Sequence, residues 1–322
     1  MLRFFSMLLL LLVYSFISVA QQYWVRVDSL FAPLSKSIEV WKSTSSVGGK
    51  PSIVYIVRAE LAATDLQFTA DTSYRRRLTP RQFYEKNQAP ILVVNASFFS
   101  FTTHQNLNLL IQNGVQCAFN IHSIAGKGRD TLTWKHPLGS AIGISKNRKA
   151  DVAWTFTDSL KRYPLAVQNP AKPMRDSQPI FSEKSFTSML QKDNKPRPWK
   201  MHTAVGGGPV LVQNGKIAIA NEEEMKFAGR AIDDRHPRTA MGYTKDGWLL
   251  VLVAEGRHPG VAEGLTLKQT AQLLVDWNCL EGLNLDGGGS SALLLNGKST
   301  ITPSDKEGER AVPGVFIIKR NN

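Results

Sequence analysis

Three Asn-Gly pairs, each shortly after an apolar run, constrain the fold of this 322-residue chain more than any other feature. Asn113-Gly114 follows Leu109-Leu110-Ile111, Asn214-Gly215 follows Val210-Leu211-Val212, and Asn296-Gly297 follows Leu293-Leu294-Leu295. Both residues of each pair tolerate the positive φ of a tight turn, so each pair predicts a β-hairpin. Because hairpins join antiparallel strands, the chain is expected to build antiparallel sheets.

Alternating apolar stretches indicate further strands at residues 53–61, 91–98, 248–254 and 312–319. Two helices are expected as well, because Thr79-Pro80-Arg81-Gln82 and Thr266-Leu267-Lys268-Gln269 each combine an N-cap Thr with a Gln able to close a capping box. Gly282 is the expected stop of the second helix. The predicted fold class is therefore α+β, with mixed, mostly antiparallel sheets flanked by a few helices.

The order of elements suggests a weak internal duplication. Each predicted helix leads into an apolar strand with a polar end, at 91–95 and again at 283–286. Two pseudo-duplicated halves would form one domain, and Asn95 and Asp286 would then meet at one cleft. The alternative is chance, because the usual alternation of helices, strands and polar turns in proteins of mixed structure produces a similar pattern.

The first twenty residues have the layout of a secretory signal peptide. Arg3 gives a positive start, residues 7–13 are apolar, and Ser18 and Ala20 predict cleavage after Ala20. The alternative is a membrane anchor, for which the apolar run is short. We therefore expect an exported protein that is periplasmic, extracellular or at the cell surface, with no stable membrane insertion after cleavage.

The formal net charge is +13, and removal of Arg3 with the leader leaves +12. A basic balance often indicates nucleic acid, but the predicted export and the scattered cations argue against that partner. A phosphate-bearing or otherwise anionic glycan fits equally well. Cys117 and Cys279 are compatible with a disulfide or with two free thiols. The six His are scattered and no metal-ligand spacing occurs, so we expect no metal and no cofactor.

The segment Asp286-Gly287-Gly288-Gly289-Ser290-Ser291 is the strongest candidate for chemistry. Three glycines are either a tight turn or a bare backbone that admits a ligand and presents amides to an anion. The Asp at the end of a strand favours function. A second triplet, Gly206-Gly207-Gly208, follows His202, and two such triplets suggest two backbone walls around one small ligand.

Two further segments offer charged groups. Arg238 in Arg235-His236-Pro237-Arg238 carries a planar fork of donors suited to phosphate or carboxylate. Glu255 and Arg257 follow a predicted buried strand, where they form either a site or a simple ion pair.

Taken in order, these segments resemble the phosphodiester glycosidase family. The matching blocks are Val94-Asn95-Ala96-Ser97-Phe98-Phe99, the run from Ala204 to Leu211 with Asn214-Gly215, His236-Pro237-Arg238-Thr239-Ala240, Glu255-Gly256-Arg257, and the run from Gly264 through Asn284-Leu285-Asp286-Gly287-Gly288-Gly289-Ser290-Ser291 to Asn296-Gly297. The resemblance covers about residues 90–318, and the last block is the most specific. It departs from the family at Glu255, where Asp is usual, and at Ser97, where Gly is common.

We expect the chain to divide into a signal peptide (1–20), an N-terminal part with strands and the first helix (21–89) and, as the resemblance implies, a phosphodiester glycosidase-like catalytic core (90–322). Within the core, the polar and Pro-rich residues 163–200 are expected to be an insertion or long loop rather than core.

The implied reaction is hydrolysis of a sugar-1-phosphodiester, at the bond between sugar C1 and a phosphate oxygen. The catalytic candidates are Asp286 and Glu255. The candidates for substrate binding are Asn95, His202, Gly206, Gly207, His236, Arg238, Arg257, Gly287, Gly288, Gly289 and Ser290. The expected partner is a carbohydrate or phosphoglycan. The alternatives are a non-catalytic envelope glycan-binding protein and an exopolysaccharide-processing factor.

Overall fold

A computed structural model describes residues 23–321, so the predicted signal peptide lies outside the described residues. Within this range the chain forms sheets of eight, seven, five and three strands, paired antiparallel, together with a few short helices. The predicted α+β class with mostly antiparallel sheets is therefore confirmed. None of the described helices is long and apolar enough to cross a membrane.

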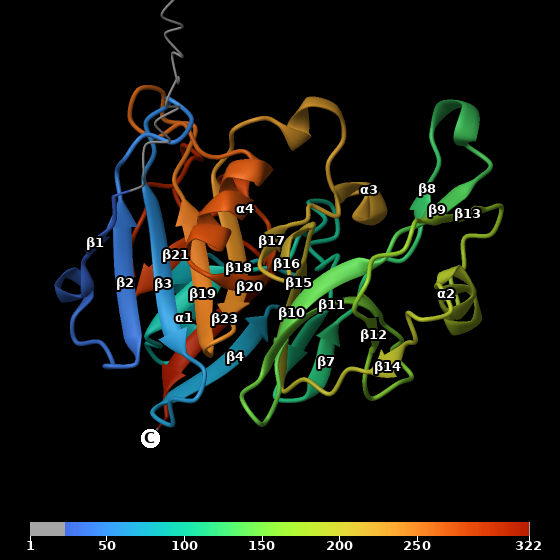
Figure 1. Cartoon of the computed structure of the whole chain (residues 1–322), viewed down its shortest axis with the longest axis horizontal. Helices are drawn as coiled ribbons and strands as arrows, with labels where there is room; N and C mark the ends of the chain where they lie inside the picture. Colours follow the sequence, from blue (N-terminus) through green and yellow to red (C-terminus); the bar gives the residue numbers. More distant parts are fainter. Residues whose placement is uncertain (1–22, 322) are drawn as a thin grey trace, which may run out of the picture.

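The eight-stranded sheet occupies the left and centre of Figure 1. Its strand order is β1 (Val25–Arg26), β2 (Ile38–Ser43), β3 (Val54–Glu60), β19 (Trp248–Ala254), β18 (Arg238–Thr244), β20 (Cys279–Asn284), β16 (Val210–Gln213) and β17 (Lys216–Ile217). Strands β18 and β19 are buried along most of their length because the sheet is covered on both faces.

The seven-stranded sheet lies to the right in Figure 1, with a three-stranded sheet beyond it. The seven strands run in the order β14 (Arg197–Pro198), β12 (Leu165–Val167), β11 (Ala150–Phe156), β10 (Gly139–Ile144), β15 (Thr203–Gly207), β6 (Leu110–Gln112) and β7 (Val115–Ala118). The smaller sheet contains β13 (Met174–Asp176), β9 (Trp134–His136) and β8 (Ile124–Ala125).

The five-stranded sheet joins a strand from the N-terminal part of the chain to the last strand. Its order is β22 (Lys298–Ser299), β21 (Leu293–Leu295), β5 (Leu92–Asn95), β23 (Gly314–Arg320) and β4 (Leu66–Thr72). Strand β23 pairs with β4 over seven residues, from Gly314↔Thr72 to Arg320↔Leu66.

The two predicted helices are present, and both capping boxes form. Thr79 and Gln82 cap α1 (Pro80–Lys86), and Thr266 and Gln269 cap α4 (Leu267–Asp276). The predicted stop at Gly282 is wrong, because α4 ends at Asp276 and Gly282 lies inside β20. Asn278, with φ of 57°, supplies the left-handed turn after the helix instead.

The remaining helices are short. They are α2 (Glu183–Met189), α3 (Asn221–Glu224) and the 3-10 turns η1 (Asp28–Phe31), η2 (Gly128–Asp130), η3 (Gly229–Ile232) and η4 (Gly288–Ser290).

The three predicted hairpins are confirmed. Asn113-Gly114 connects β6 to β7, Asn214-Gly215 connects β16 to β17, and Asn296-Gly297 connects β21 to β22. All six turn residues have positive φ, between 45° and 80°. This is the backbone twist that a two-residue hairpin requires.

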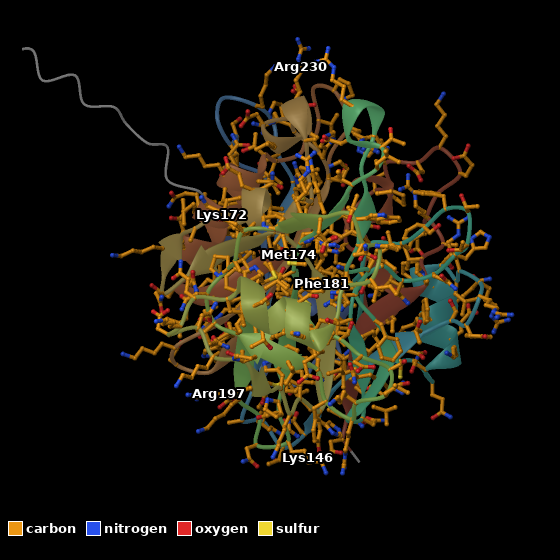
Figure 2. All side chains as sticks on the ribbon, turned by 90° about the vertical axis from the view of Figure 1, so that its right-hand side faces the viewer. Lys146, Lys172, Met174, Phe181, Arg197 and Arg230 are labelled. Carbon is orange, nitrogen blue, oxygen red and sulfur yellow. The ribbon has the colours of Figure 1, made fainter. Side chains whose placement is uncertain are left out.

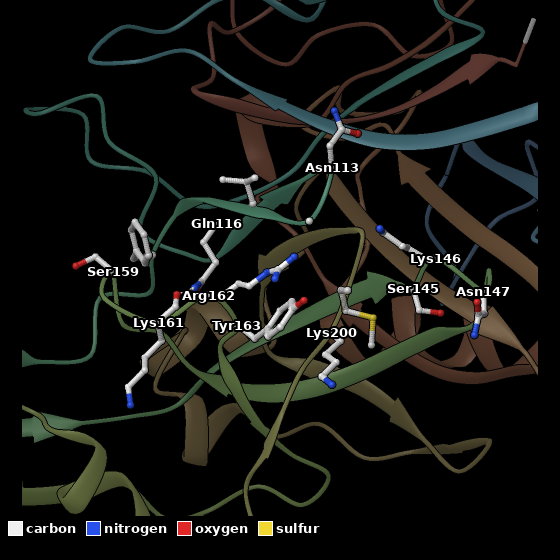
Figure 3. Close-up of a pocket in the computed structure, with 14 residues that line it drawn as sticks. Asn113, Gln116, Ser145, Lys146, Asn147, Ser159, Lys161, Arg162, Tyr163 and Lys200 are labelled. Atoms are coloured by element: carbon white, nitrogen blue, oxygen red, sulfur yellow. Dashed lines mark hydrogen bonds between the residues drawn. The ribbon is translucent and has the colours of Figure 1, made fainter.

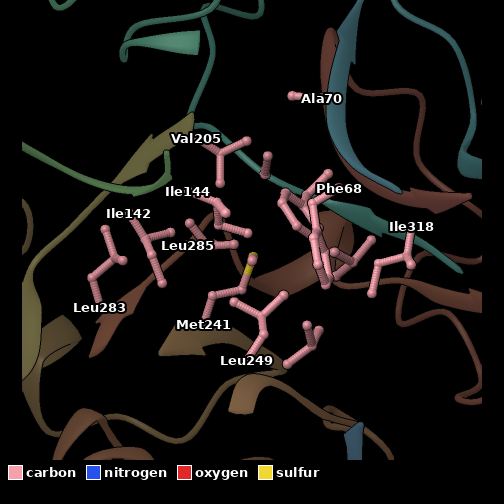
Figure 4. Close-up of a cluster of buried hydrophobic side chains, with 14 of the residues drawn as sticks. Phe68, Ala70, Ile142, Ile144, Val205, Met241, Leu249, Leu283, Leu285 and Ile318 are labelled. Atoms are coloured by element: carbon pink, nitrogen blue, oxygen red, sulfur yellow. The ribbon is translucent and has the colours of Figure 1, made fainter. Parts of the chain in front are cut away.

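The main core lies where the three larger sheets meet, as Figure 4 shows. Met241 and Leu283 come from the eight-stranded sheet, Ile142 from the seven-stranded sheet, and Phe68 and Ile318 from the five-stranded sheet. Helix α4 covers the opposite face of the eight-stranded sheet, and α1 covers the five-stranded sheet. One shared core therefore fixes all three sheets relative to one another.

One expectation needs correction. Residues 163–200 were expected to lie outside the core, but they contain β12, β13, α2 and β14, and they bury the side chains of Phe186 and Trp199. Of the two alternatives for the cysteines, the structure has free thiols, with Cys117 exposed and Cys279 buried.

Candidate active site

Strand ends from all three larger sheets converge at one rim. Arg238 begins β18 and pairs with Ala254, the last residue of β19, so Glu255 follows at the same edge. Ala240 pairs with Asn284, the last residue of β20, which places Asp286 just beyond that edge. The rim also receives Asn95 at the end of β5 and Gly207 at the end of β15.

Asn95 holds this rim together. Its Nδ2 donates a 2.6 Å hydrogen bond to the main-chain carbonyl of Asp286, and its Oδ1 accepts from Thr239 Oγ1 at 2.8 Å and from Ala292 N at 3.0 Å. The side chain is fully buried. Asn95 and Asp286 therefore meet as predicted, but Asn95 positions the Asp286 turn and is not itself an open ligand contact.

Asp286 is the residue of the rim whose carboxyl group titrates near neutral pH. Its main-chain N–H donates to Ala96 O at 2.9 Å, which fixes the turn. The side chain is part-exposed but closely surrounded, and burial raises the pKa of its carboxyl to about 7. Contacts with the Ser290 hydroxyl, the Arg310 charge and the Gly287 amide oppose that rise. A carboxyl group with this pKa can exchange a proton near neutral pH.

The glycines after Asp286 form a tight turn with close neighbours. Gly287 O accepts from Ser290 N, and Gly288 N donates to Pro237 O at 2.8 Å. A Cβ on Gly288 would lie 2.9 Å from Arg257 Nη2, and a Cβ on Gly289 would collide with the Arg310 and Asp305 side chains. The glycines therefore admit two guanidinium groups to the turn, and Gly288 N is not free for an anion.

Arg238 is 2% exposed and is held by two carbonyl groups. Its Nε donates to Leu265 O at 2.9 Å and its Nη2 donates to Asp234 O at 3.0 Å. Burial and the nearby charge of Arg257 lower its pKa to about 10. It stays protonated at neutral pH, and no carboxylate within the described chain forms an ion pair with it.

Arg257 and His236 complete this cationic wall. Arg257 is exposed, with φ of 64°, and its guanidinium faces Gly288. Burial, followed by the charges of Arg238 and Arg257, lowers the pKa of His236. Its Nδ1 is buried with no hydrogen-bond partner in the described chain. The predicted residues Arg238, Arg257 and His236 are thus brought together at one surface that favours an anion.

Glu255 is engaged on both carboxylate oxygens. Oε1 lies 2.9 Å from His258 Nδ1, and Oε2 accepts from Thr302 N at 2.8 Å. The residue is 5% exposed. In this arrangement Glu255 anchors the segment around Thr302, which leaves Asp286 as the less constrained carboxylate of the two catalytic candidates.

The second glycine triplet, Gly206-Gly207-Gly208, does not form a ligand wall at its first two residues. Gly206 and Gly207 are buried, and a Cβ on Gly206 would lie 2.7 Å from Asn108 Cβ. A Cβ on Gly207 would collide with Asn284 O. These glycines allow β15 to pack tightly against the neighbouring backbone, so the prediction of two glycine walls around a ligand is wrong for residues 206 and 207.

His202 also lies apart from the rim. It precedes β15, at the opposite end from Gly207, and its main-chain N–H donates to Ile144 O. Burial lowers its pKa, as do the charges of Lys146 and Arg148. The structure therefore separates His202 from the other predicted site residues.

Sequence reasoning missed an acid and a base close to Gly208. Glu224 is 2% exposed and accepts from Ser140 Oγ at 2.7 Å, Trp154 Nε1 at 3.0 Å and Val210 N at 2.8 Å. Burial raises its pKa to about 7, against the charge of Lys226. Burial also lowers the pKa of Lys226.

Aromatic rings connect Lys226 to the cationic wall. The Lys226 ammonium lies 5.5 Å from the ring centre of Phe98, which contacts Phe227 at 6.1 Å between centroids. The Arg238 guanidinium lies 5.5 Å from the same Phe227 ring. Lys226 therefore belongs to the rim. The sequence signal that could have found it is its position between the block that ends at Asn214-Gly215 and the block that begins at His236.

The sequence model of the phosphodiester glycosidase family matches residues 87–319, which include every residue of the rim. This chain belongs to the phosphodiester glycosidase family.

Across residues 23–321 no three His, Cys, Asp or Glu side chains gather in a way that would hold a metal ion.

Relatives with curated names match a shorter region. The N-acetylglucosamine-1-phosphodiester alpha-N-acetylglucosaminidase of Bos taurus is 34% identical over 103 residues, which are 30% of this chain and 19% of that protein. A prophage-derived uncharacterized protein of Bacillus subtilis, YomE, is 37% identical over 84 residues, 26% of this chain and 13% of that protein. The match thus spans about a fifth or less of these relatives.

Solved structures share the fold over most of the chain. The catalytic domain of the zebrafish N-acetylglucosamine-1-phosphodiester alpha-N-acetylglucosaminidase aligns with a TM-score of 0.60 and 19% identity, covering 90% of this chain and 86% of that one. A hypothetical protein from Synechocystis aligns with a TM-score of 0.60 and 14% identity, covering 89% of this chain and 63% of that one. At these identities the likeness concerns the fold.

Proposed function

We propose that this chain hydrolyses a sugar-1-phosphodiester at the bond between sugar C1 and the phosphate oxygen. The observation that carries the proposal is Asp286, a carboxyl group with a pKa near 7 on a glycine turn faced by the Arg257 guanidinium. Family membership supports the reaction class, and the names of the matched mammalian enzymes point to phosphodiester-linked sugars as well.

The cationic wall suits the phosphate half of such a substrate. Arg257 is an exposed guanidinium group that can bind phosphate oxygens through paired N–H donors, whereas the buried Arg238, whose Nε and Nη2 donate to Leu265 O and Asp234 O, contributes mainly its charge. Lys226 adds a third positive charge beside the ring of Phe98. These cations would bind the diester anion and stabilise the second negative charge that develops on phosphate as the C1–O bond breaks.

Asp286 supplies the carboxylate for attack at C1. It either takes a proton from a water molecule whose oxygen bonds to C1, or bonds to C1 itself before water releases the sugar. In both routes the C1–O electron pair leaves with the phosphate, the water oxygen ends on the sugar, and the products are a free sugar and a phosphate monoester. Because phosphate is a good leaving group, the reaction depends more on charge stabilisation than on an acid.

Export is part of the proposal. The layout of residues 1–20, with Arg3 before an apolar run and Ala20 at the expected cleavage point, supports a role outside the cytoplasm. Substrates there would be glycans or glycoconjugates of the envelope or surroundings, including exopolysaccharides. N-terminal sequencing of secreted or periplasmic protein tests this, and an unprocessed Met1 in the mature protein contradicts it.

A second candidate function is glycan binding without turnover. It is favoured by Glu255, whose two carboxylate oxygens are both engaged and leave Asp286 without a second open carboxylate. Saturable binding of a phosphodiester with no released sugar over several hours would support this alternative.

The decisive experiment measures free sugar released from methyl phosphodiesters of glucose-, N-acetylglucosamine- and mannose-1-phosphate, with the corresponding nitrophenyl glycosides as comparison. We expect release from at least one phosphodiester and loss of at least 1000-fold in rate for Asp286→Asn. Asp276→Asn, on the last residue of α4, is the matched control. Equal rates for wild type and Asp286→Asn would refute the assignment of Asp286.

A further inference from the structure

A hollow lies at the end of the seven-stranded sheet away from the rim. It has a volume of about 540 Å³ and an adjoining hollow of about 310 Å³ shares Ser145 and Lys146 with it. Along strand β10, Ser140 pairs with Gly207 at the rim and Ile144 pairs with Thr203 near the hollow. At ~3.3 Å per residue those two pairs lie roughly 13 Å apart. The hollow is therefore a separate place from the rim.

Positive charge dominates its lining, which Figure 3 shows. Lys146, Lys161, Arg162 and Lys200 contribute cations, and none of the lining residues is an Asp or Glu. Lys161 forms an exposed 3.3 Å ion pair with Glu183. Within residues 23–321 the other three cations have no ion pair. Unpaired cations that converge on a hollow attract an anion.

An aromatic ring and neutral polar groups accompany the cations. Tyr163 lies between Arg162, 5.1 Å from its ring centre, and Lys200, 6.0 Å away. Asn113, Gln116, Asn147, Ser145 and Ser159 add amides and hydroxyls to the lining. A ring face packs on the C–H face of a sugar, amides and hydroxyls pair with sugar hydroxyls, and cations pair with acidic groups.

The walls also contain polar atoms without partners. In the described chain Gln116 Oε1 is buried with no hydrogen bond, although Gln116 Nε2 donates to Lys161 O at 2.7 Å. Arg148 Nη1 and His202 Nδ1, in the adjoining hollow, are buried and unpaired in the same way. Buried polar groups are normally paired, so these atoms indicate a place where a polar ligand completes the hydrogen bonding.

We infer that this hollow is a binding site for an acidic oligosaccharide, separate from the rim that carries Asp286. Its volume is within the usual range for small-molecule sites. A nucleic acid fits less well, because single strands are normally held by a row of successive aromatic side chains along a groove, and the lining offers two aromatic residues, Tyr163 and Phe119. Lys146 and Arg230, a cation near the rim strand β18 in sequence, lie at opposite ends of the face in Figure 2.

The test is calorimetric titration of the full chain with trigalacturonate at 150 mM salt, where loosely attracted ions are largely screened. Maltotriose is the neutral comparison and a short oligothymidylate is the nucleic-acid comparison. We expect trigalacturonate to bind at least 10-fold more tightly than either. The site variant is Arg162→Gln with Lys200→Gln, and the matched control is Arg230→Gln with Lys245→Gln.

The inference requires the site variant to lose at least 10-fold in trigalacturonate affinity while the control pair binds as wild type does. Tyr163→Ala should also lose affinity, which simple charge attraction does not explain. Equal binding by site variant and control, tighter binding of oligothymidylate, or no binding of trigalacturonate at millimolar concentration would each overturn it. Release of sugar from a phosphodiester should be unchanged in the site variant, so this result and that of Asp286→Asn fail or succeed independently.

Discussion

Asn95 Nδ2 donates a 2.6 Å hydrogen bond to the main-chain carbonyl of Asp286, and this contact joins the end of β5 to the turn after β20. The two residues are 191 positions apart in sequence. The Asp286 turn, which follows a strand of the eight-stranded sheet, is therefore held by a side chain of the five-stranded sheet.

The first prediction concerns that bond. Asn95→Ala leaves the Asp286 carbonyl and the Ala292 amide without their partner and the Thr239 hydroxyl with Ser291 Oγ alone, in a fully buried place. We expect the free energy of unfolding to fall by about 3 kcal/mol, as for other unpaired buried polar groups. Urea unfolding measures it. Asn147→Ala, in an exposed turn, should change stability by less than about 0.5 kcal/mol.

The second prediction concerns the pH dependence of catalysis. Asp286, with a pKa of about 7, must be ionised to act as base or nucleophile. We therefore expect kcat/KM to rise as pH increases and to level off above an apparent pKa of about 7. Initial rates of sugar release between pH 4 and 9 give this profile. A rate that falls as pH rises through 7 would assign Asp286 to acid catalysis.

The third prediction is a stability change with the same origin. The raised pKa means that the folded state binds the Asp286 proton more tightly than the unfolded state does. The stability that this proton provides is present below the unfolded pKa and is lost as pH rises through about 7. Asn cannot ionise, so the Asp286→Asn variant does not lose this stability as pH rises. The Tm of the variant should therefore exceed the wild-type Tm by a few degrees at pH 8 and by little at pH 4. A lower Tm at pH 8 would contradict the burial argument.

The fourth prediction tests the buried guanidinium. Arg238→Lys keeps a positive charge but cannot reproduce the bonds from Nε to Leu265 O and from Nη2 to Asp234 O. We expect kcat/KM for a phosphodiester to fall by about 10- to 100-fold, which corresponds to the usual free-energy contribution of a charge-assisted hydrogen bond. Arg230→Lys, on the exposed η3 turn, is the control. Unchanged kinetics in Arg238→Lys would separate this residue from the phosphate.

The fifth prediction concerns Lys226, which sequence reasoning overlooked. Lys226→Met removes the charge beside Phe98 and takes away the attraction that opposes the raised pKa of Glu224. We expect kcat/KM to fall by roughly 10-fold, about the 1.4 kcal/mol of one charge contact, with fold retained. Lys216→Met, on exposed β17, should be neutral. A loss confined to ordinary glycosides would contradict a role toward phosphate.

Local chemistry made much of the fold predictable. Asn-Gly turns and capping boxes act within a few residues, so Asn113-Gly114 and the Thr79 cap could be read directly. Gly282 failed as a helix stop because Asn278 supplies the same left-handed conformation earlier. The sequence offered no means of choosing between two residues that are both competent to end a helix.

The candidate site was predictable where it adjoins the ends of strands. Asp286 was found because an apolar strand runs into a polar turn, and Arg238 because it follows Pro237 and precedes a buried-looking run, whereas Glu224 was missed because its partners Ser140 and Trp154 lie 84 and 70 residues away. Gly207 was misjudged for a related reason. A glycine that faces a ligand and one that faces the backbone of another strand look identical in sequence, and only the packing of β15 distinguishes them.

The pairing of β3 with β19 and of β4 with β23 has a practical consequence for expression. A fragment trimmed to the family-matched residues 87–319 would lack both N-terminal partners and expose the long apolar edges of β19 and β23. Unpaired strands of this kind template aggregation. Chimeric proteins made from this chain should therefore transfer the strands before residue 87 together with the family-matched residues, as one unit.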